Sequence, residues 1–511
     1  MTRRNDDPVG TFCLVLHTHL PWLLHHGSWP VGEEWLYQAW AQAYLPVVRL
    51  LRALADEGRT DVLTLGLTPV LAAQLDDAYA LAEFHTWLGF WQMRAGQSAT
   101  RPDAVTRAHA RYEHHQSAQA IADFEQYWSG GGSAALRPLV DAGVVELLGG
   151  PATHPFQPLL DERLVTFGLR TGLDDARLRI GRRPAGIWAP ECGYRPGLEN
   201  TYQEVGVEHF VVDGPTMQQT GRSTASGVWV GDSDVVAFAR DLEVTYRVWS
   251  PKAGYPGGAW YRDFHAFDHW SGLRASRVTS KQLPPHDKAP YEPQRAQDAV
   301  AVDADDFVTT VVARLRDHAA RDGRPGLVVA AYDTELFGHW WHEGPQFLAT
   351  VLRRLPDAGV RVTTLTGARA SGHVTDRVDL PSGSWGSGKD WRVWEDPSVV
   401  DLTTRHADVS RQLVEVLTSR DAASTLGRDL AADQLVRDAL LTVASDWTFM
   451  VTKDSAAQYA RQRVADHAES FGLLADAMSR GHGVPERRLA KQQRAVDGPF
   501  GHLDARGLAA R

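Results

Sequence analysis

Short apolar segments recur through the first three quarters of this 511-residue chain, and amphipathic helices are predicted between them. Each segment has the length of a buried β-strand, and most run directly into turn residues or polar side chains. The predicted β-structure covers residues 11–16, 61–67, 144–150, 184–191, 209–214, 227–240, 328–331 and 360–365. Strand–loop–helix units with reactive side chains at the strand ends are typical of an α/β barrel, whose active site lies at the C-terminal ends of its strands.

One helical stretch is too long to be a simple connection between two strands. Residues 70–142 are rich in Ala, Gln, His and Arg, and we interpret them as a helical insertion on the barrel. Residues 250–297 are rich in Gly, Pro and aromatic residues, which predicts an irregular segment that covers a groove. Further helices between strands are predicted at residues 33–57, 161–180 and 298–321.

The character of the sequence changes near residue 398. Apolar residues then recur at helical spacing, as in Leu413, Val416 and Leu417, and no strand pattern remains. We therefore expect a catalytic barrel over residues 1–397 and an all-helical C-terminal domain over residues 398–511. The last ~25 residues are rich in Arg, Gly and Gln, and frayed ends of this kind are common in proteins.

Charge and cysteine content exclude several classes of function. The formal net charge is −10, which argues against a nucleic-acid-binding face and against binding to an anionic membrane surface. Two cysteines, Cys13 and Cys192, cannot build a disulfide framework or a four-cysteine zinc site. No apolar run reaches the ~18 residues of a membrane span, so we expect a cytoplasmic protein without nucleic-acid or membrane partners.

The richest single segment is residues 328–342, VVAAYDTELFGHWWH. A short buried strand leads into two acids, Asp333 and Glu335, and then into His339 and Trp340. Unpaired burial of two carboxylates would be costly, so folding alone explains the segment poorly, although Trp340 and its neighbour Trp341 could be core residues. Acids, imidazoles and indoles at a strand end favour a site that holds a sugar face and moves protons.

Histidines follow two other predicted strands. His17 and His19 are two residues apart on an extended segment, so they point to the same side and could be zinc ligands or hydrogen-bond donors in a polar pocket. His154 follows the third strand in a Gly- and Pro-rich turn that would display it, although it could equally be a surface-loop histidine.

A second carboxyl group occupies a strand end of its own. Glu191 lies between Trp188, Pro190 and a Gly–Tyr pair, which is an unusual setting for a surface glutamate. Together with Asp333 it supplies the two carboxyl groups that cleavage of a glycosidic bond requires. On one barrel rim they could stand at the ~5 Å separation of a retaining mechanism.

Tryptophan is heavily used, with 18 residues, and many lie beside acids, histidines or turns. The segment 384–394 holds Trp385, Trp391 and Trp394 separated by small and polar residues, which favours an aromatic platform for sugar rings over a core. The helical segment 444–460 carries Asp446 on an edge that could reach the barrel mouth.

Five ordered segments together resemble glycoside hydrolase family 57 and, within it, the 1,4-α-glucan branching enzymes. They are HTHLPW (17–22), GGPATHP (149–155), WAPECGY (188–194), YDTELFGHWW (332–341) and SWGSGKDWRVW (384–394). The resemblance covers essentially the whole chain. It implies an incomplete (β/α)7 barrel with a helical insertion, followed by a helical C-terminal domain.

The resemblance also implies roles for the matched residues. Glu191 would be the nucleophile and Asp333 the acid/base of a retaining reaction on an α-1,4-glucan such as amylose or glycogen, with transfer that forms α-1,6 branches. Three histidines would line the donor-sugar subsite by hydrogen bonding, which displaces the zinc interpretation, and no metal or cofactor is implied. The expected substrate-binding residues are His17, His19, His154, Trp188, Trp249, Glu335, His339, Trp340, Trp385, Trp394 and Asp446, with Trp249, Trp385 and Trp394 on the acceptor side.

One segment departs from the pattern of the branching members of the family. These usually carry a mobile loop with a tyrosine near its tip before the segment that ends at Trp249, and that loop helps to exclude water. Residues 214–227 are short, polar and free of aromatic residues here. A less closed site lets water compete with the acceptor, so substantial hydrolysis is expected.

Other activities remain open at this stage. An α-amylase or a 4-α-glucanotransferase of the same family would use the same carboxyl pair. A metal-dependent carbohydrate deacetylase also places Asp and His at the strand ends of an irregular barrel. A glycan-binding protein without activity would not need two opposed carboxyl groups.

Overall fold

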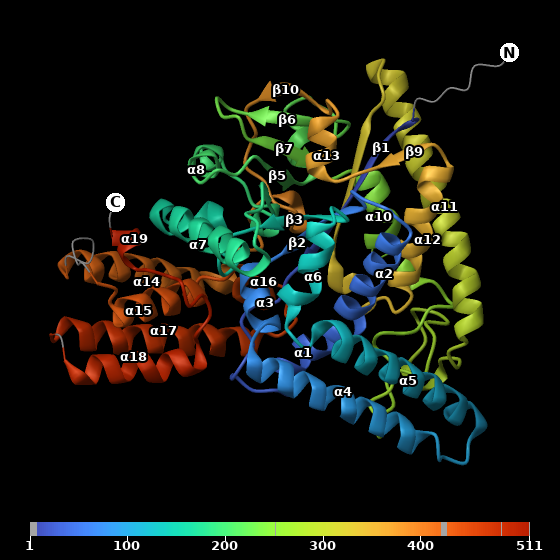
Figure 1. Ribbon diagram of the computed structural model, residues 1–511, viewed down its shortest axis with the longest axis horizontal. Helices are drawn as coiled ribbons and strands as arrows, with labels where there is room; N and C mark the ends of the chain where they lie inside the picture. The colour runs from blue at the N-terminus through green and yellow to red at the C-terminus, as the bar shows by residue number, and fades with distance from the viewer. Residues whose placement is uncertain (1–7, 251, 421–426, 482, 510–511) are drawn as a thin grey trace.

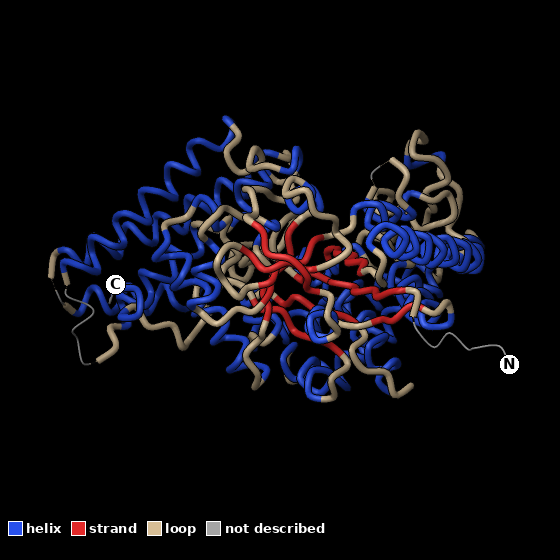
Figure 2. Tube along the Cα trace, turned by 90° about the horizontal axis from the view of Figure 1, so that it is seen from above, coloured by secondary structure: helices blue, strands red, loops and turns tan. Residues whose placement is uncertain are grey.

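A curled, mainly parallel sheet occupies the centre of the molecule, and helices pack around it (Figure 1 and Figure 2). The computed structural model describes residues 8–250, 252–420, 427–481 and 483–509. Along the sheet the strand order is β10-β6-β7-β5-β4-β3-β2-β1-β8, and β9 also pairs with β1. The strands are β1 (Gly10–Thr18), β2 (Leu63–Leu67), β3 (Val145–Gly149), β4 (Gly186–Ile187), β5 (His209–Val212), β6 (Gly227–Val230), β7 (Val236–Ala239), β8 (Leu327–Asp333), β9 (Val360–Val362) and β10 (Val374–Val378).

Seven neighbouring strands, from β7 through β1 to β8, are parallel. The sheet curls so far that the backbone N–H of Asp241, just after β7, donates to the carbonyl oxygen of Val329 in β8 (2.8 Å). Strands buried on both faces carry continuous apolar runs, and all nine residues of β1 are buried. The predicted incomplete (β/α)7 barrel is confirmed, with β6 and β10 added beyond β7.

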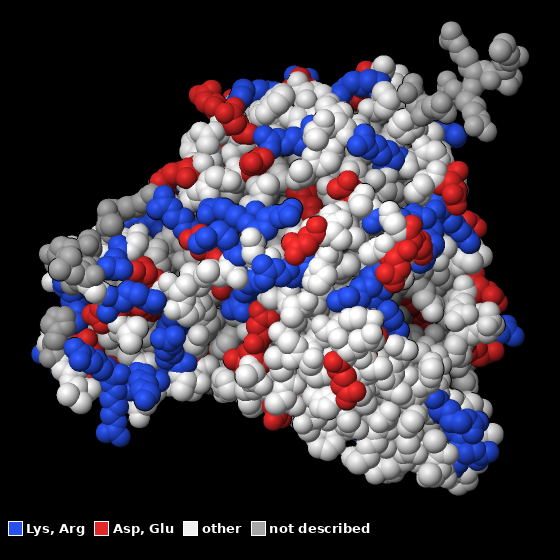
Figure 3. Space-filling model, viewed as in Figure 1, with Lys and Arg blue, Asp and Glu red and all other residues white. Residues whose placement is uncertain are grey.

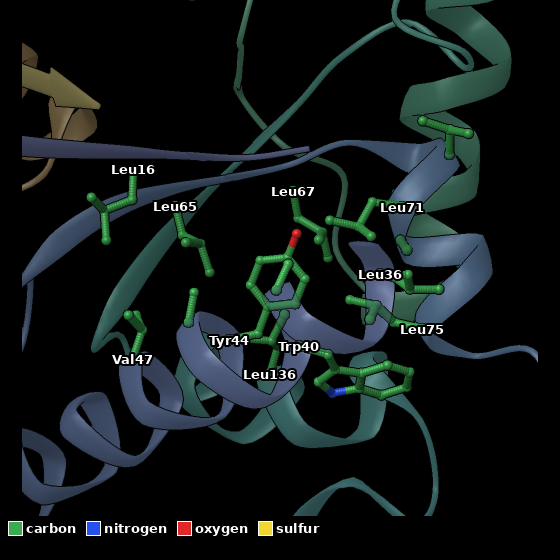
Figure 4. Close-up of a cluster of buried hydrophobic side chains, with 14 of the residues drawn as sticks. Leu16, Leu36, Trp40, Tyr44, Val47, Leu65, Leu67, Leu71, Leu75 and Leu136 are labelled. Atoms are coloured by element: carbon green, nitrogen blue, oxygen red, sulfur yellow. The ribbon is translucent and has the colours of Figure 1, made fainter. Parts of the chain in front are cut away.

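Helices outside the sheet supply the other half of the core. In Figure 4, Tyr44 from the helical segment after β1 lies near Leu67 of β2, and Trp40 belongs to the same buried cluster. Burial of each large apolar side chain of this kind contributes about 1.5–3 kcal/mol. The helices that cover the sheet are α1 (Glu33–Ala39), α2 (Leu45–Asp56), α3 (Pro69–Leu75), α6 (Gly132–Asp141), α7 (Glu162–Ile180), α8 (Leu198–Glu204), α9 (Gly214–Gln218), α10 (Leu242–Trp249), α11 (Pro293–Asp322), α12 (Gly344–Asp357) and α13 (Leu365–Ala370).

A pair of long helices extends along the lower edge of the molecule in Figure 1. These are α4 (Ala78–Ser98) and α5 (Ala104–Asp123), which pack side by side, and α5 continues into a π-helical turn at Phe124–Trp128. The indole N–H of Trp91 in α4 donates to Glu113 of α5 (3.0 Å). They lie within residues 70–142, the stretch that the sequence predicts to be a helical insertion.

The described residues after 399 are mainly helical, as predicted, and form the left side of the molecule in Figure 1. Their helices are α14 (Val400–Ser419), α15 (Leu430–Thr442), α16 (Ser445–Thr452), α17 (Ala457–Ser479), α18 (Val484–Val496) and α19 (Arg506–Ala509). The start of α16 reaches the sheet, because the backbone N–H of Ser445 donates to the carbonyl oxygen of His154 after β3 (3.0 Å). The exact domain boundary at residue 397 stays a prediction.

Two predictions of local structure are wrong. The expected strand 184–191 contains only the two-residue strand β4, because Pro184 and Pro190 lack the N–H that a central strand needs. The expected frayed tail is ordered over residues 487–509. Its Arg- and Gln-rich composition conceals three large buried apolar residues, Phe500, Leu503 and Leu508, which pack into the main core.

A buried polar group also holds this tail in place. The Asp497 carboxylate lies 2.7 Å from His26 Nε2 and 3.2 Å from His467 Nδ1. Arg463 Nη2 lies 2.6 Å from His467 Nε2, and a guanidinium can only donate, so Nε2 accepts and Nδ1 carries the hydrogen of the neutral ring. This tautomer leaves Nδ1 without a free lone pair, so the group is a hydrogen-bonded anchor rather than a metal site.

Charges of both signs are interspersed on the face shown in Figure 3. A mixture of this kind does not form the continuous basic face that nucleic-acid binding requires. Among the described residues, no helix has the length and apolar character needed to cross a membrane.

Candidate active site

A cavity of about 650 Å³ lies at the C-terminal ends of the central strands. His17 and Asp333 end the paired strands β1 and β8 and are register partners, while His154 and Glu191 follow β3 and β4. Ten of the predicted site residues line this one cavity, namely His17, His19, His154, Glu191, Trp249, Asp333, Glu335, Trp340, Trp385 and Asp446.

Glu191 is held by two neutral hydrogen-bond donors. Trp385 Nε1 donates to one carboxylate oxygen and Ser445 Oγ to the other, both at 2.8 Å. The backbone of Glu191 has φ +61°, a strained conformation that tends to persist only where the surroundings enforce it. Burial and the charge of Asp446 raise the pKa of Glu191, and the two donated hydrogen bonds oppose that rise.

Asp333 has a different environment, although it lines the same cavity. Among the described residues, none donates a hydrogen bond to its carboxyl group. Burial, then the negative charges of Glu335 and Glu191, raise the pKa of Asp333 well above its usual range, and Arg240 opposes them. Asp333 is therefore suited to carry a proton at neutral pH, as a general acid must.

Three imidazoles form a stack beside the two carboxyl groups. The rings of His19 and His154 are 3.7 Å apart, and His17 lies against Trp188 at 4.5 Å with an interplanar angle of 15°. His17 Nε2 and His154 Nε2 are 3.1 Å apart, so one donates and the other accepts. Burial lowers the pKa of both of these histidines well below the usual range, which favours neutral hydrogen-bonding groups over cations.

His19 is the exception among the three imidazoles. Burial opposes its protonation, but its Nε2 lies 3.0 Å from Asp446 Oδ1, and this carboxylate raises the pKa of His19 above its ordinary value. Nitrogen and oxygen atoms of His19, His154 and Asp446 lie within 4.8 Å of one another and could hold a metal ion. The hydrogen bond between His19 and Asp446 already gives both groups a partner without a metal ion.

Aromatic side chains form one wall of the cavity. The rings of Trp249 and Trp385 are near parallel at 6.3 Å, and Trp340 meets Trp249 edge-on at the same separation. The indole of Trp340 is 39% exposed, so a ligand can reach it. Flat apolar faces beside carboxyl groups suit the C–H faces of a sugar chain.

Three predicted site residues lie outside the cavity lining. Trp188 is fully buried beneath His17 and supports its ring. His339 turns toward Gln42, with 2.9 Å between Nδ1 and Oε1. Trp394 is 1% exposed and stacks on Phe156 at 4.2 Å. Substrate binding by these three residues stays a prediction.

A family model described as glycosyl hydrolase family 57 matches residues 13–378, and one described as 1,4-alpha-glucan branching enzyme, C-terminal, matches residues 406–507. The chain belongs to glycoside hydrolase family 57. A probable 1,4-alpha-glucan branching enzyme of Mycobacterium tuberculosis is 54% identical over 98% of this chain and 99% of that protein.

Two solved structures of the family are also similar to this chain. The branching enzyme of Thermococcus kodakaraensis, crystallised with glucose, has a TM-score of 0.93 and 31% identity, covering 98% of this chain and 96% of its own. The branching enzyme of Pyrococcus horikoshii has a TM-score of 0.91 and 32% identity, covering 98% and 97%. The similarity thus extends over the barrel and the C-terminal helices alike.

The family 57 site also contains residues that the sequence analysis missed. Arg240 lines the cavity and donates to the fully buried Asp213 (2.8 Å), which also pairs with Lys389 (2.7 Å). Asp213 and Arg240 directly follow β5 and β7, so the strand-end argument applied to His17 and Asp333 would have found them. Ser445 gave no such signal, because it lies 254 residues from the Glu191 carboxylate to which it donates.

Proposed function

We propose that this family 57 chain is a retaining 1,4-α-glucan branching enzyme, which cleaves α-1,4 links and re-forms the chain as α-1,6 branches in glycogen or a related glucan. The observation that carries the proposal is the pair of carboxyl groups on one cavity, Glu191 held by neutral donors and Asp333 surrounded by negative charge. Surroundings that differ in this way keep one carboxyl group ionised as a nucleophile and the other protonated as an acid. The names of the similar proteins support the assignment. Cytoplasmic location stays a prediction.

In the first step the Glu191 carboxylate attacks the anomeric carbon of a bound glucan. The bond from that carbon to the leaving O4 breaks, and the proton of Asp333 moves to that oxygen. The products are a glucosyl ester of Glu191 and a shortened chain with a free 4-hydroxyl group. The hydrogen bonds from Trp385 and Ser445 orient the attacking carboxylate.

In the second step Asp333, now a carboxylate, takes the proton from the 6-hydroxyl group of an acceptor glucan. The acceptor oxygen attacks the anomeric carbon and releases Glu191, so both carboxyl groups return to their starting states. Two displacements at one carbon retain the α configuration. We assign the neutral imidazoles of His17 and His154 to the donor sugar, and the indoles of Trp249 and Trp385 to the acceptor.

Water can replace the acceptor in the second step, and residues 214–227 do not help to exclude it. None of residues 214–227, all of which the structure describes, lines the cavity. The segment is instead tied to the barrel, since Thr224 Oγ1 donates to Asp241 (2.9 Å) and Met217 is buried. We therefore propose that hydrolysis accompanies branching.

Product analysis on amylose tests this function. The expected result is loss of iodine staining together with new α-1,6 links, measured as chains released by a debranching enzyme, plus a smaller increase in reducing ends. Reducing ends without new α-1,6 links would instead identify an α-amylase. Lengthened linear chains would identify a 4-α-glucanotransferase.

A metal-dependent carbohydrate deacetylase is the second candidate, and the grouping of His19, His154 and Asp446 is the observation that favours it. Both nitrogens of His154 already have partners, Ser445 at 3.0 Å and His17 at 3.1 Å, which leaves no lone pair for an ion without rearrangement. We expect full activity on amylose after chelation. Zinc bound in equimolar amount, with activity lost on its removal, would favour the deacetylase.

A further inference from the structure

A π-helical turn lies between α1 and α2 and packs against the loop that follows Asp333. The turn covers Trp40–Tyr44, and the loop continues from β8 through the 3-10 turn Thr334–Leu336. A π turn inserts an extra residue into an α-helix, and such insertions are frequent at functional sites. The side chains of this turn are therefore placed to act on the loop that carries Glu335.

Two contacts fix the turn to the loop. The side chain of Gln42 meets His339 Nδ1 at 2.9 Å. Gly338 has φ +119°, and a Cβ atom there would lie 1.8 Å from the carbonyl oxygen of Gln42, so only glycine allows this approach. These two contacts thus hold the loop at a fixed position against the π-helical turn.

The third contact reaches a carboxyl group of the active site. Tyr44 OH donates to Glu335 Oε1 at 2.5 Å, and the backbone N–H of His19 donates to the same oxygen at 3.2 Å. Tyr44 is buried, with its ring near Leu67 and its hydroxyl group pointing away from the helix (Figure 4). Burial and the charge of Glu335 raise the pKa of Tyr44 well above its usual range, so the hydroxyl group remains a donor.

Glu335 in turn acts on Asp333 through its charge. Burial raises the pKa of Glu335 to about 7, and the hydrogen bond from Tyr44 opposes this rise. After burial, the charge of Glu335 is the largest influence that favours the protonated form of Asp333. Other charged groups also act on this pair. The charges of Glu191 and Asp446 favour protonation of Asp333, and the charge of Arg240 opposes it. The charge of His19 favours the ionised form of Glu335.

We propose that Tyr44 is a positioning residue for the acid/base step: its hydroxyl group stabilises the ionised Glu335, and that charge keeps the proton on Asp333. The inference rests on the proposed function, because it assumes that Asp333 is the proton donor. No atom of Tyr44 needs to touch the substrate for this role. Tyr44 instead connects the packing of the π-helical turn to the protonation state of the site.

The test is the pH dependence of kcat on amylose for Tyr44→Phe, counting branching and hydrolysis together. Without its donor, Glu335 holds a proton to higher pH, and Asp333 then loses its own proton at lower pH. Activity falls as pH rises through the pKa of Asp333, so the alkaline limb of the pH profile moves to lower pH. The expected shift is at most about one pH unit, because that is the size produced by complete loss of one nearby charge and Glu335 keeps part of its charge in this variant.

Tyr37→Phe is the matched control, because Tyr37 is buried on α1 and its hydroxyl group donates to a different glutamate, Glu33. Its alkaline limb is expected to stay in place. Glu335→Gln is expected to move the limb in the same direction as Tyr44→Phe, and the double variant no further than Glu335→Gln alone.

An alkaline limb that stays in place in Tyr44→Phe, or that moves equally in Tyr37→Phe, overturns the inference. If Tyr44→Phe is inactive, the infrared band of protonated carboxyl groups, assigned by its loss in Asp333→Asn, gives the same titration without turnover. A wild-type protein that leaves amylose unchanged would instead contradict the proposed function.

Discussion

Two carboxyl groups line the same cavity, and burial raises the pKa of both, yet their hydrogen-bond partners and their charged neighbours differ. Glu191 receives hydrogen bonds on both oxygens from Trp385 and Ser445. Asp333 receives none from the described residues and instead has Glu335 as a negatively charged neighbour. Because hydrogen bonds favour an anion and like charge favours a proton, the difference prepares one group to attack and the other to donate.

The largest expected effect comes from removing the attacking group. Glu191→Gln keeps the shape of the side chain but cannot form the ester, so kcat on amylose should fall by at least about a thousandfold. Glu199→Gln is the control, because Glu199 is another buried glutamate, which accepts a hydrogen bond from Tyr194 and lies outside the cavity lining. If the two variants lose similar activity at unchanged Tm, Glu191 is not the nucleophile.

The loss of activity caused by removing the proton donor should depend on the leaving group of the substrate. Asp333→Asn is expected to lower kcat on amylose by about a hundredfold or more, since the leaving sugar oxygen needs a proton. On an α-maltosyl fluoride the first step should be much less affected, because fluoride leaves without one. The measurement is the pre-steady-state release of fluoride. An equal loss with both substrates would contradict the role of Asp333.

A smaller effect is expected from one of the donors to Glu191. Ser445→Ala removes a hydrogen bond that favours the ionised carboxylate, so the pKa of Glu191 should rise further. Activity increases as pH rises through that pKa, so the acid limb of kcat/KM should move to higher pH, with less than about a tenfold loss at its maximum. The alkaline limb should stay in place.

Ser410→Ala is the control for this variant. Ser410 lies on α14 and donates to the carbonyl oxygen of His406 (2.8 Å). Its pH profile should match that of the wild type. An acid limb that moves to lower pH in Ser445→Ala would mean that Ser445 does not stabilise the Glu191 carboxylate.

The sequence predicted the two carboxyl groups because each follows its own short strand within a few residues. The same local pattern placed His17 and His154 at the strand ends of one barrel rim. It failed for Ser445 and Tyr44, which lie 254 and 291 residues from the carboxylates to which they donate, since no local signal records contacts of that range. The curled sheet brings them together only after folding.

Packing also changed the interpretation of residues whose composition looked suggestive. Small and polar neighbours of Trp394 favoured an open platform, but this indole is buried against Phe156. Polar composition favoured a frayed tail after residue 486, but three apolar side chains and the Asp497 anchor hold it. In both cases buried contacts outweighed the average composition of the segment.

Trapping the covalent intermediate tests the central claim most directly. The Asp333→Ala protein, treated with α-maltosyl fluoride and digested, should yield a peptide that contains Glu191 and carries the mass of one maltosyl group. Second-step catalysis is missing in this variant, so the ester should accumulate. A sugar on any other residue, or none in a protein that still releases fluoride, would contradict the account.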